Sequence, residues 1–170
     1  MEKKLYHAAE DDKVKDVKEI LRTNPNLDVN WKSEEGRTAL IIACEIDHDS
    51  IVSILLTHPD IDVNLKDKHG WTSFNSAWIN GCASVVRLLL KDSRVMVNEP
   101  TSRGNTPLFW AAFYGKLDVI MWWIASGREM DLGTPGNDET DAIMVAKERG
   151  MTEVVALLER FMENPVETRH

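Results

Sequence analysis

A repeat with a fixed period of 34 residues constrains the fold of this chain more than any other feature. Three tripeptides hold the same place in successive units: Thr38-Ala39-Leu40, Thr72-Ser73-Phe74 and Thr106-Pro107-Leu108. Glycines and asparagines keep the same interval, at Gly36, Gly70 and Gly104 and at Asn30, Asn64 and Asn98. Such a period is typical of stacked copies of one supersecondary unit, so the sequence predicts a solenoid. Solenoids offer an extended surface for recognition.

Each unit contains two short apolar segments with helical spacing, as in residues 38–45 and 50–57. The threonine that opens the first segment is a suitable helix cap, because its hydroxyl can accept from free backbone N–H groups. The second segments read IVSILL, VVRLLL and VIMWWI, and a short extended stretch with a glycine turn follows. These patterns predict an all-α repeat solenoid of helix-turn-helix units joined by hairpin-like connectors.

Several columns together resemble the ankyrin repeat: G-x-T-P-L, paired alanines, a turn glycine, V-V-x-L-L-L and D-V-N. The resemblance covers roughly residues 3–162. It implies one ankyrin repeat domain over residues 1–164 and a polar tail over residues 165–170. Five units are expected, at about 3–31, 32–65, 66–99, 100–133 and 134–162.

The chain also departs from the ankyrin pattern. The histidine of T-P-L-H is replaced by Ile41, Asn75 and Phe109, of which only Asn75 offers a comparable polar contact. In the last unit the columns slip to a spacing of 35 residues, which favours Asp141 over Thr140 as the helix cap. The first unit slips by one residue as well. Its second helix is rich in charge, as suits the end of a stack that meets water.

Composition excludes several classes of partner. A net charge of −8 and a pI near 5.1 argue against nucleic acid, whose binding needs clustered Lys and Arg. No stretch has the length and hydrophobicity needed to span a membrane, and the first residues do not resemble a signal peptide. Cys44 and Cys82 both fall in apolar helix patterns, where small buried thiols are expected. We therefore expect a cytoplasmic protein without membrane or nucleic-acid partners.

The family resemblance implies binding through the hairpin tips and the first-helix face of a concave groove. The free positions there are rich in aromatic residues in the third and fourth units. We expect a partner protein or peptide to contact Trp71, Ile79, Trp110, Phe113, Tyr114, His69, Arg103, Glu45 and Ile46. A further groove column holds Ile42, Ser76, Trp110 and Val145. The alternative is that these aromatic side chains fill space between repeats.

The remaining tryptophans and the acidic residues have other interpretations. Trp122 and Trp123 replace leucines of the second helix and are expected in the core, Trp78 is expected to fill space between repeats, and Trp31 suits either environment. Five acidic residues lie on the groove side of the first two units: Glu10, Asp11, Glu34, Glu35 and Glu45. They form either an ordinary solvated surface or a region that selects a basic, apolar partner segment.

No arrangement of residues indicates catalysis. The five histidines are scattered, no His/Cys/Asp cluster has metal-ligand spacing, and the glycines do not form a phosphate loop. Cys44 and His48 are close in sequence, but a buried thiol in an alanine column is expected to be inert. We expect a non-catalytic interaction module, such as an adaptor or scaffold, without cofactor or metal. Two alternatives are a self-associating structural element and a segment of a larger ankyrin protein whose activity lies elsewhere.

Overall fold

The structure is a computed structural model that describes residues 1–132 and 141–165, and these residues contain ten α-helices and no strand. Thr140 and all of the expected tail except Pro165 lie outside the described residues. The helices are α1 (Glu2–Glu10), α2 (Val14–Thr23), α3 (Ala39–Glu45), α4 (Asp49–Leu56), α5 (Ser73–Asn80), α6 (Ala83–Lys91), α7 (Pro107–Phe113), α8 (Leu117–Ser126), α9 (Ala142–Glu148) and α10 (Thr152–Glu163). The predicted all-helical repeat solenoid is confirmed.

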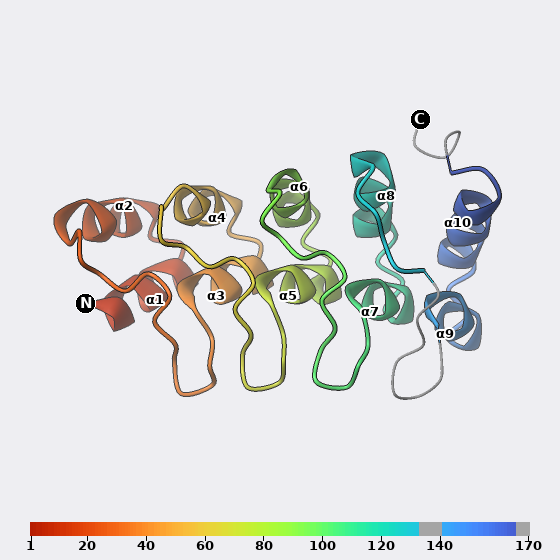
Figure 1. Cartoon of the computed structure of the whole chain (residues 1–170), viewed down its shortest axis with the longest axis horizontal. Helices are drawn as coiled ribbons and strands as arrows, with labels where there is room; N and C mark the ends of the chain where they lie inside the picture. The colour runs from red at the N-terminus through yellow and green to blue at the C-terminus, as the bar shows by residue number, and fades with distance from the viewer. Residues whose placement is uncertain (133–140, 166–170) are drawn as a thin grey trace.

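The helices form two layers along one axis (Figure 1). The first helices α1, α3, α5, α7 and α9 contact one another in sequence, and the second helices α2, α4, α6, α8 and α10 do the same above them. The connectors project as long hairpin loops on the side of the first helices (Figure 1). This arrangement follows from the two apolar faces of each unit, because a single helix pair cannot bury both faces alone.

The first helices begin where the sequence predicts. The hydroxyls of Thr38, Thr72 and Thr106 accept from the backbone N–H three residues later, at 3.2–3.3 Å. Asp141 replaces the threonine in the last unit and accepts from Met144 N at 2.7 Å. The predicted slip of this unit by one residue is therefore confirmed, because the carboxylate caps the same donor as the hydroxyls do.

The core runs between the layers and includes two of the tryptophans. Trp78 is almost wholly buried, and its ring lies 5.3 Å from Phe74 and 6.2 Å from Trp123, centroid to centroid. The contact between Trp78 in α5 and Trp123 in α8 joins the third helix pair to the fourth across the interface between repeats. Trp78 fills space between repeats and Trp123 lies in the core, as the sequence predicts.

Trp122, in contrast, does not belong to the core, and the prediction for it was wrong. Its side chain is 42% exposed, whereas that of the adjacent Trp123 is 1% exposed. Helix α8 buries Val119, Ile120, Trp123 and Ile124. At 100° per residue, Trp122 points about 130° away from the centre of that buried face. The equivalent Ile54 and Leu88 are only partly buried, so this column marks the edge of the core.

The connectors reverse direction at the same point in three units. Ser33, Asp67 and Thr101 each donate a backbone N–H to the carbonyl four residues later, at 2.9–3.0 Å. Neighbouring hairpins are also joined, since Lys68 N donates to Glu35 O at 3.1 Å and Ser102 N donates to His69 O at 3.2 Å. The hairpin tips around Glu35, Lys68, His69 and Ser102 are therefore joined to one another rather than independent, and we call them the hairpin wall.

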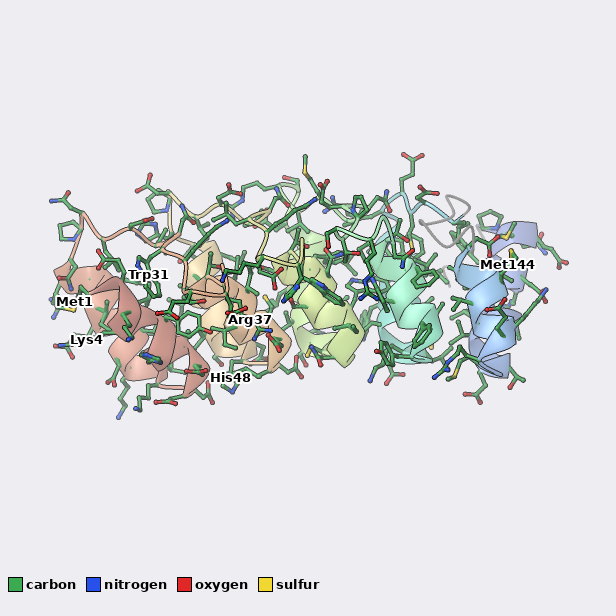
Figure 2. All side chains as sticks on the ribbon, turned by 90° about the horizontal axis from the view of Figure 1, so that it is seen from below. Met1, Lys4, Trp31, Arg37, His48 and Met144 are labelled. Atoms are coloured by element: carbon green, nitrogen blue, oxygen red, sulfur yellow. The ribbon has the colours of Figure 1, made fainter. Side chains whose placement is uncertain are left out.

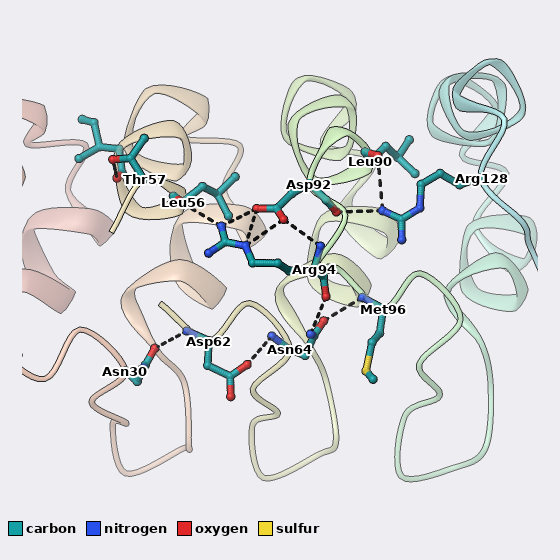
Figure 3. A network of polar contacts seen from close by, with 11 residues as sticks. Asn30, Leu56, Thr57, Asp62, Asn64, Leu90, Asp92, Arg94, Met96 and Arg128 are labelled. Carbon is teal, nitrogen blue, oxygen red and sulfur yellow. Dashed lines mark hydrogen bonds and ion pairs between the residues drawn. The ribbon is translucent and has the colours of Figure 1, made fainter. Parts of the chain in front are cut away.

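The repeated asparagines join each unit to the next. Asn64 donates its side-chain amide to Arg94 O at 2.8 Å and accepts from Met96 N at 2.8 Å. Asn30 makes the same pair of bonds to residues 60 and 62, and Asn98 to residues 129 and 131. Figure 3 shows the bonds of Asn64 and the bond between Asn30 and Asp62. Each asparagine side chain thus satisfies two backbone groups of the following connector, which explains why asparagine recurs every 34 residues.

Two arginines, themselves 34 residues apart, add contacts that were not predicted from the sequence. Arg94 donates to Leu56 O at 2.8 Å while paired with Asp92 at 2.6 Å. Arg128 donates to the carbonyls of Asp92 and Val95, at 2.9 and 2.6 Å (Figure 3 shows the bond to Asp92). Each guanidinium reaches back to the preceding unit, where carbonyls at the end of the second helix lack helical partners.

Candidate partner-binding groove

Three hollows lie in a row where the hairpins meet the first helices. The N-terminal hollow, of about 500 Å³, is lined by residues that include Tyr6, Trp31, Lys32, Glu34 and Arg37. The middle hollow, of about 290 Å³, is lined by residues that include Arg37, Glu45, Asp67, Trp71 and Ile79. The aromatic hollow, of about 240 Å³, is lined by residues that include His69, Trp71, Ile79, Arg103, Trp110 and Tyr114. Adjacent hollows share residues, so together they form one groove.

The groove begins beside the first unit. Figure 2 views the stack from the hairpin side, with Trp31 and Arg37 next to the first helices. The ring of Trp31 meets that of Tyr6 edge-on at 6.1 Å between centroids, and both line the N-terminal hollow. The sequence left the environment of Trp31 open, and Tyr6 was missed altogether. The sequence offered one signal for this hollow, which is that Tyr6 and Trp31 are both aromatic.

The aromatic residues of the third and fourth units come together at the other end of the groove. The ring of Trp71 lies 5.6 Å from that of Trp110, which in turn stacks on Tyr114 at 6.3 Å. Trp110 also meets Phe109 edge-on at 5.3 Å. Trp71 and Trp110 are half-buried, and Tyr114 is 47% exposed. The rings therefore pack against one another, as the space-filling interpretation expects, and still present a surface. Their contact with a partner stays a prediction.

The indole N–H of Trp110 has no hydrogen-bond acceptor among the described residues and is covered by neighbouring atoms. An unsatisfied buried donor of this kind costs about 1–3 kcal/mol. Trp78 and Trp123 share this property in the core, but Trp110 has it in the lining of a hollow.

The charges of the middle hollow are compensated within the chain. Arg37 pairs with Glu45 at 2.9 Å, and Asp67 Oδ1 accepts from the backbone N–H groups of His69 and Trp71 at 2.8 and 2.9 Å. Glu35 lies 3.7 Å from Lys68 at the tips. Of the five acidic residues on this side, four have a basic partner, and Glu34 makes no ion pair with a described residue.

The predicted site residues do not all line the groove. Trp71, Ile79, Trp110, Tyr114, His69, Arg103 and Glu45 line the middle or the aromatic hollow. Ile46 is exposed but lies outside all three hollows, and Phe113 is half-buried under the guanidinium of Arg149, 4.4 Å from its ring centroid. In the further groove column, Ile42, Ser76 and Val145 are buried, although Ser76 still contributes to the lining of the middle hollow, and Trp110 is half-buried.

The convex face carries a second apolar surface, which we call the Trp122 patch. Met121 and Trp122 are both exposed, and with Ala83, Asp118 and Ala125 they line a shallow hollow of about 320 Å³. The guanidinium of Arg87 lies 5.3 Å from the Trp122 ring centroid. The patch was not predicted from the sequence, because Trp122 was placed in the core.

The residues with catalytic potential are engaged in structural roles. Burial raises the pKa of the Cys44 thiol well above its usual value, and His48 Nδ1 lies 3.0 Å from the backbone oxygen of Ala9. Burial, aided by the nearby Asp47 charge, raises the pKa of Cys82 to about 11. A protonated buried thiol is a poor nucleophile. In the described part of the chain, no three His, Cys, Asp or Glu side chains converge on a point suited to a metal ion.

Comparison with known proteins identifies the repeat. A family model for ankyrin repeats, in three copies, matches residues 5–101, more than half of the chain. The helix pairs α7–α8 and α9–α10 follow the matched segment. No curated protein sequence matches the chain. Across residues 1–132 and 141–165, every helix falls short of the length and hydrophobicity that a membrane span requires.

Proposed function

Because the chain belongs to the ankyrin repeat family, whose members are generally protein-interaction modules, we propose that it is a non-catalytic module that binds a partner protein or peptide along this groove. The observation that carries the proposal is the aromatic hollow. Trp71, Trp110 and Tyr114 line it from two consecutive units. Clustered aromatic side chains are the usual anchors of protein interfaces, where truncation of one anchor costs about 2 kcal/mol or more.

Other features support an adaptor rather than an enzyme. The groove extends over the first four units, which suits an extended segment better than a compact substrate. Two buried free cysteines support a reducing compartment such as the cytoplasm. The net charge of −8 supports a protein partner over nucleic acid.

A capture experiment tests the proposal. The full chain is immobilised and offered an extract of its source cells, and bound proteins are identified by mass spectrometry. The double variant Trp110→Ala/Tyr114→Ala should lose the bound partner. The matched control Met121→Ala/Trp122→Ala removes similar apolar area from the convex face and should keep it. Equal capture of the partner by the parent chain and by both folded variants would contradict the proposal.

Self-association is a second candidate, favoured by the Trp122 patch. Met121 is 51% exposed beside the exposed Trp122, and large exposed apolar patches mark interaction sites. Sedimentation at several concentrations distinguishes the two candidates. A concentration-dependent dimer that disappears in Met121→Ala/Trp122→Ala supports self-association, and a strict monomer of the parent chain contradicts it.

A further inference from the structure

The chemistry of the aromatic hollow restricts the kind of partner segment that fits it. Pockets that hold whole small ligands measure about 300–1,000 Å³. The aromatic hollow, at about 240 Å³, is smaller and is open along the groove. Its walls are Trp71, Ile79, Trp110 and Tyr114. This size and lining suit one large apolar side chain projecting from a partner segment.

The uncompensated charge at this hollow is positive. Its lining contains Arg103 and His69 but no Asp or Glu, and neither basic side chain forms an ion pair with a described residue. The neighbouring middle hollow differs, because Arg37 there is already paired with Glu45. Asp67 borders the hollow, where its Oδ1 accepts from the backbone N–H groups of His69 and Trp71. The permanent charge of Arg103 therefore lines the hollow without a counter-ion among the described residues.

The hairpin wall holds this charge in place. His69 O accepts from Ser102 N at 3.2 Å and from Ser102 Oγ at 2.6 Å, which fixes the third tip against the fourth. Asp67 Oδ1 additionally accepts from His69 N at 2.8 Å. Both basic residues thus extend from backbone that is already ordered. Groups held in their bound position lose less entropy on binding, which favours recognition at this point.

We infer that the aromatic hollow takes an aromatic or large aliphatic side chain of a partner segment that carries an Asp or Glu within two residues of it. This inference rests on the proposed function and specifies its partner. It reverses the sequence-based hypothesis of a basic partner, because four of the five acidic residues behind that hypothesis are paired within the chain. The bound carboxylate accepts hydrogen bonds from Arg103, a geometry that guanidinium and carboxylate favour.

The acidic character of the whole chain does not exclude an acidic segment. The net charge of −8 repels such a segment at long range, but charges are screened beyond about 8 Å at physiological salt. Within that distance the charged side chains in the lining of the hollow are Arg103 and His69. Electrostatic specificity of this kind is set by the local arrangement of charge rather than by the total.

A displayed library of random 12-residue peptides tests the inference. Peptides are selected on the immobilised full chain, and those that still bind Trp110→Ala/Tyr114→Ala are discarded. The remaining sequences should pair an aromatic or large aliphatic residue with Asp or Glu. Synthetic copies should bind Arg103→Glu about tenfold more weakly by fluorescence anisotropy. Lys18→Glu makes the same charge change on exposed α2 and should bind normally.

The outcomes separate the two proposals. Hollow-dependent peptides with Lys or Arg beside the apolar residue, or with unchanged affinity for Arg103→Glu, overturn the inference and leave the proposed function standing. A selection that yields no hollow-dependent peptide contradicts the proposed function, and the inference falls with it. Circular dichroism of each variant shows that lost binding is not lost folding.

Discussion

The side-chain amide of Asn75 donates to the backbone carbonyl of Glu99 at 3.1 Å, so a buried group in α5 holds the connector that leads to the next unit. The hydroxyl of Thr72 donates to the other side of the same amide, at Asn75 Oδ1. Asn75 is the one polar residue in a column that otherwise holds Ile41 and Phe109. The polar contact expected of it is confirmed.

Asn75→Ala should lower the free energy of unfolding by about 1–3 kcal/mol, because it leaves the part-buried carbonyl of Glu99 without its donor and the buried hydroxyl of Thr72 without its acceptor. Asn80→Ala is the control: Asn80 is exposed and bonds only within its own helix, so it should cost below about 0.5 kcal/mol. Urea unfolding followed by circular dichroism measures both. Asn75→His should keep most of the stability, and equal losses for Asn75→Ala and Asn80→Ala would show that the bond to Glu99 matters little.

The adjacent tryptophans of α8 should respond very differently to truncation. Trp123→Ala removes a fully buried ring and should cost about 3–5 kcal/mol. Trp122→Ala loses only partial packing and the contact with Arg87, and should cost about 1 kcal/mol or less. Urea unfolding of each variant measures the two losses of stability. A large loss for Trp122→Ala would place that ring in the core after all.

The hairpin wall should be sensitive to added volume at Gly70. A Cβ there would lie 2.5 Å from Ser102 N, and φ is +77°, so Gly70→Ala should cost more than about 2 kcal/mol. Gly150 has a similar φ of +70°, but nothing lies within 4 Å of its Cβ position. Gly150→Ala should therefore cost only about 1 kcal/mol. Thermal unfolding compares the pair, and similar shifts in Tm would argue against close contact between the tips.

Alkaline pH should lower the free energy of unfolding through the Cys82 thiol. The pKa of Cys82 is raised to about 11 in the folded chain, against about 8.5 for a free thiol. The unfolded chain therefore loses the proton first. The contribution of Cys82 to stability is fully present below about pH 8.5 and falls as the pH rises toward 11. Cys82→Ala should reduce the slope of stability against pH in this window.

The same pKa predicts slow alkylation. At pH 8 the thiolate fraction of Cys82 should be roughly a hundredfold or more below that of a free cysteine. Iodoacetamide labelling read by mass spectrometry should modify Cys82 quickly in urea and very slowly without it. Rapid labelling of the folded chain would contradict its burial.

The sequence predicted the helix caps that recur with the period, at Thr38, Thr72 and Thr106. The period also singled out Asn30, Asn64 and Asn98, but it did not predict the bridge that each makes to the next connector. Asp141 was also predictable, since a slip in the period moves the cap with it.

Features that depend on side-chain direction or reach were not predictable. Trp122 occupies a column of apolar residues, and only the rotation of α8 in the stack turns it outward. The pairing of Arg37 with Glu45 joins a tip to a helix end within one unit, and it cancels a charge that the sequence assigned to the surface. The exposure of the groove aromatics likewise depends on how the rings of Trp71 and Trp110 stack.

The asparagine bridges of Figure 3 have a consequence for how such a chain can change in length. Each bridge needs only the unit before it and the unit after it, and the helix contacts follow the same rule. A second copy of residues 64–97, inserted after Val97, would bring both the asparagine and the connector it binds. Tandem duplication at this point therefore lengthens the groove by one step and requires no compensating mutation elsewhere.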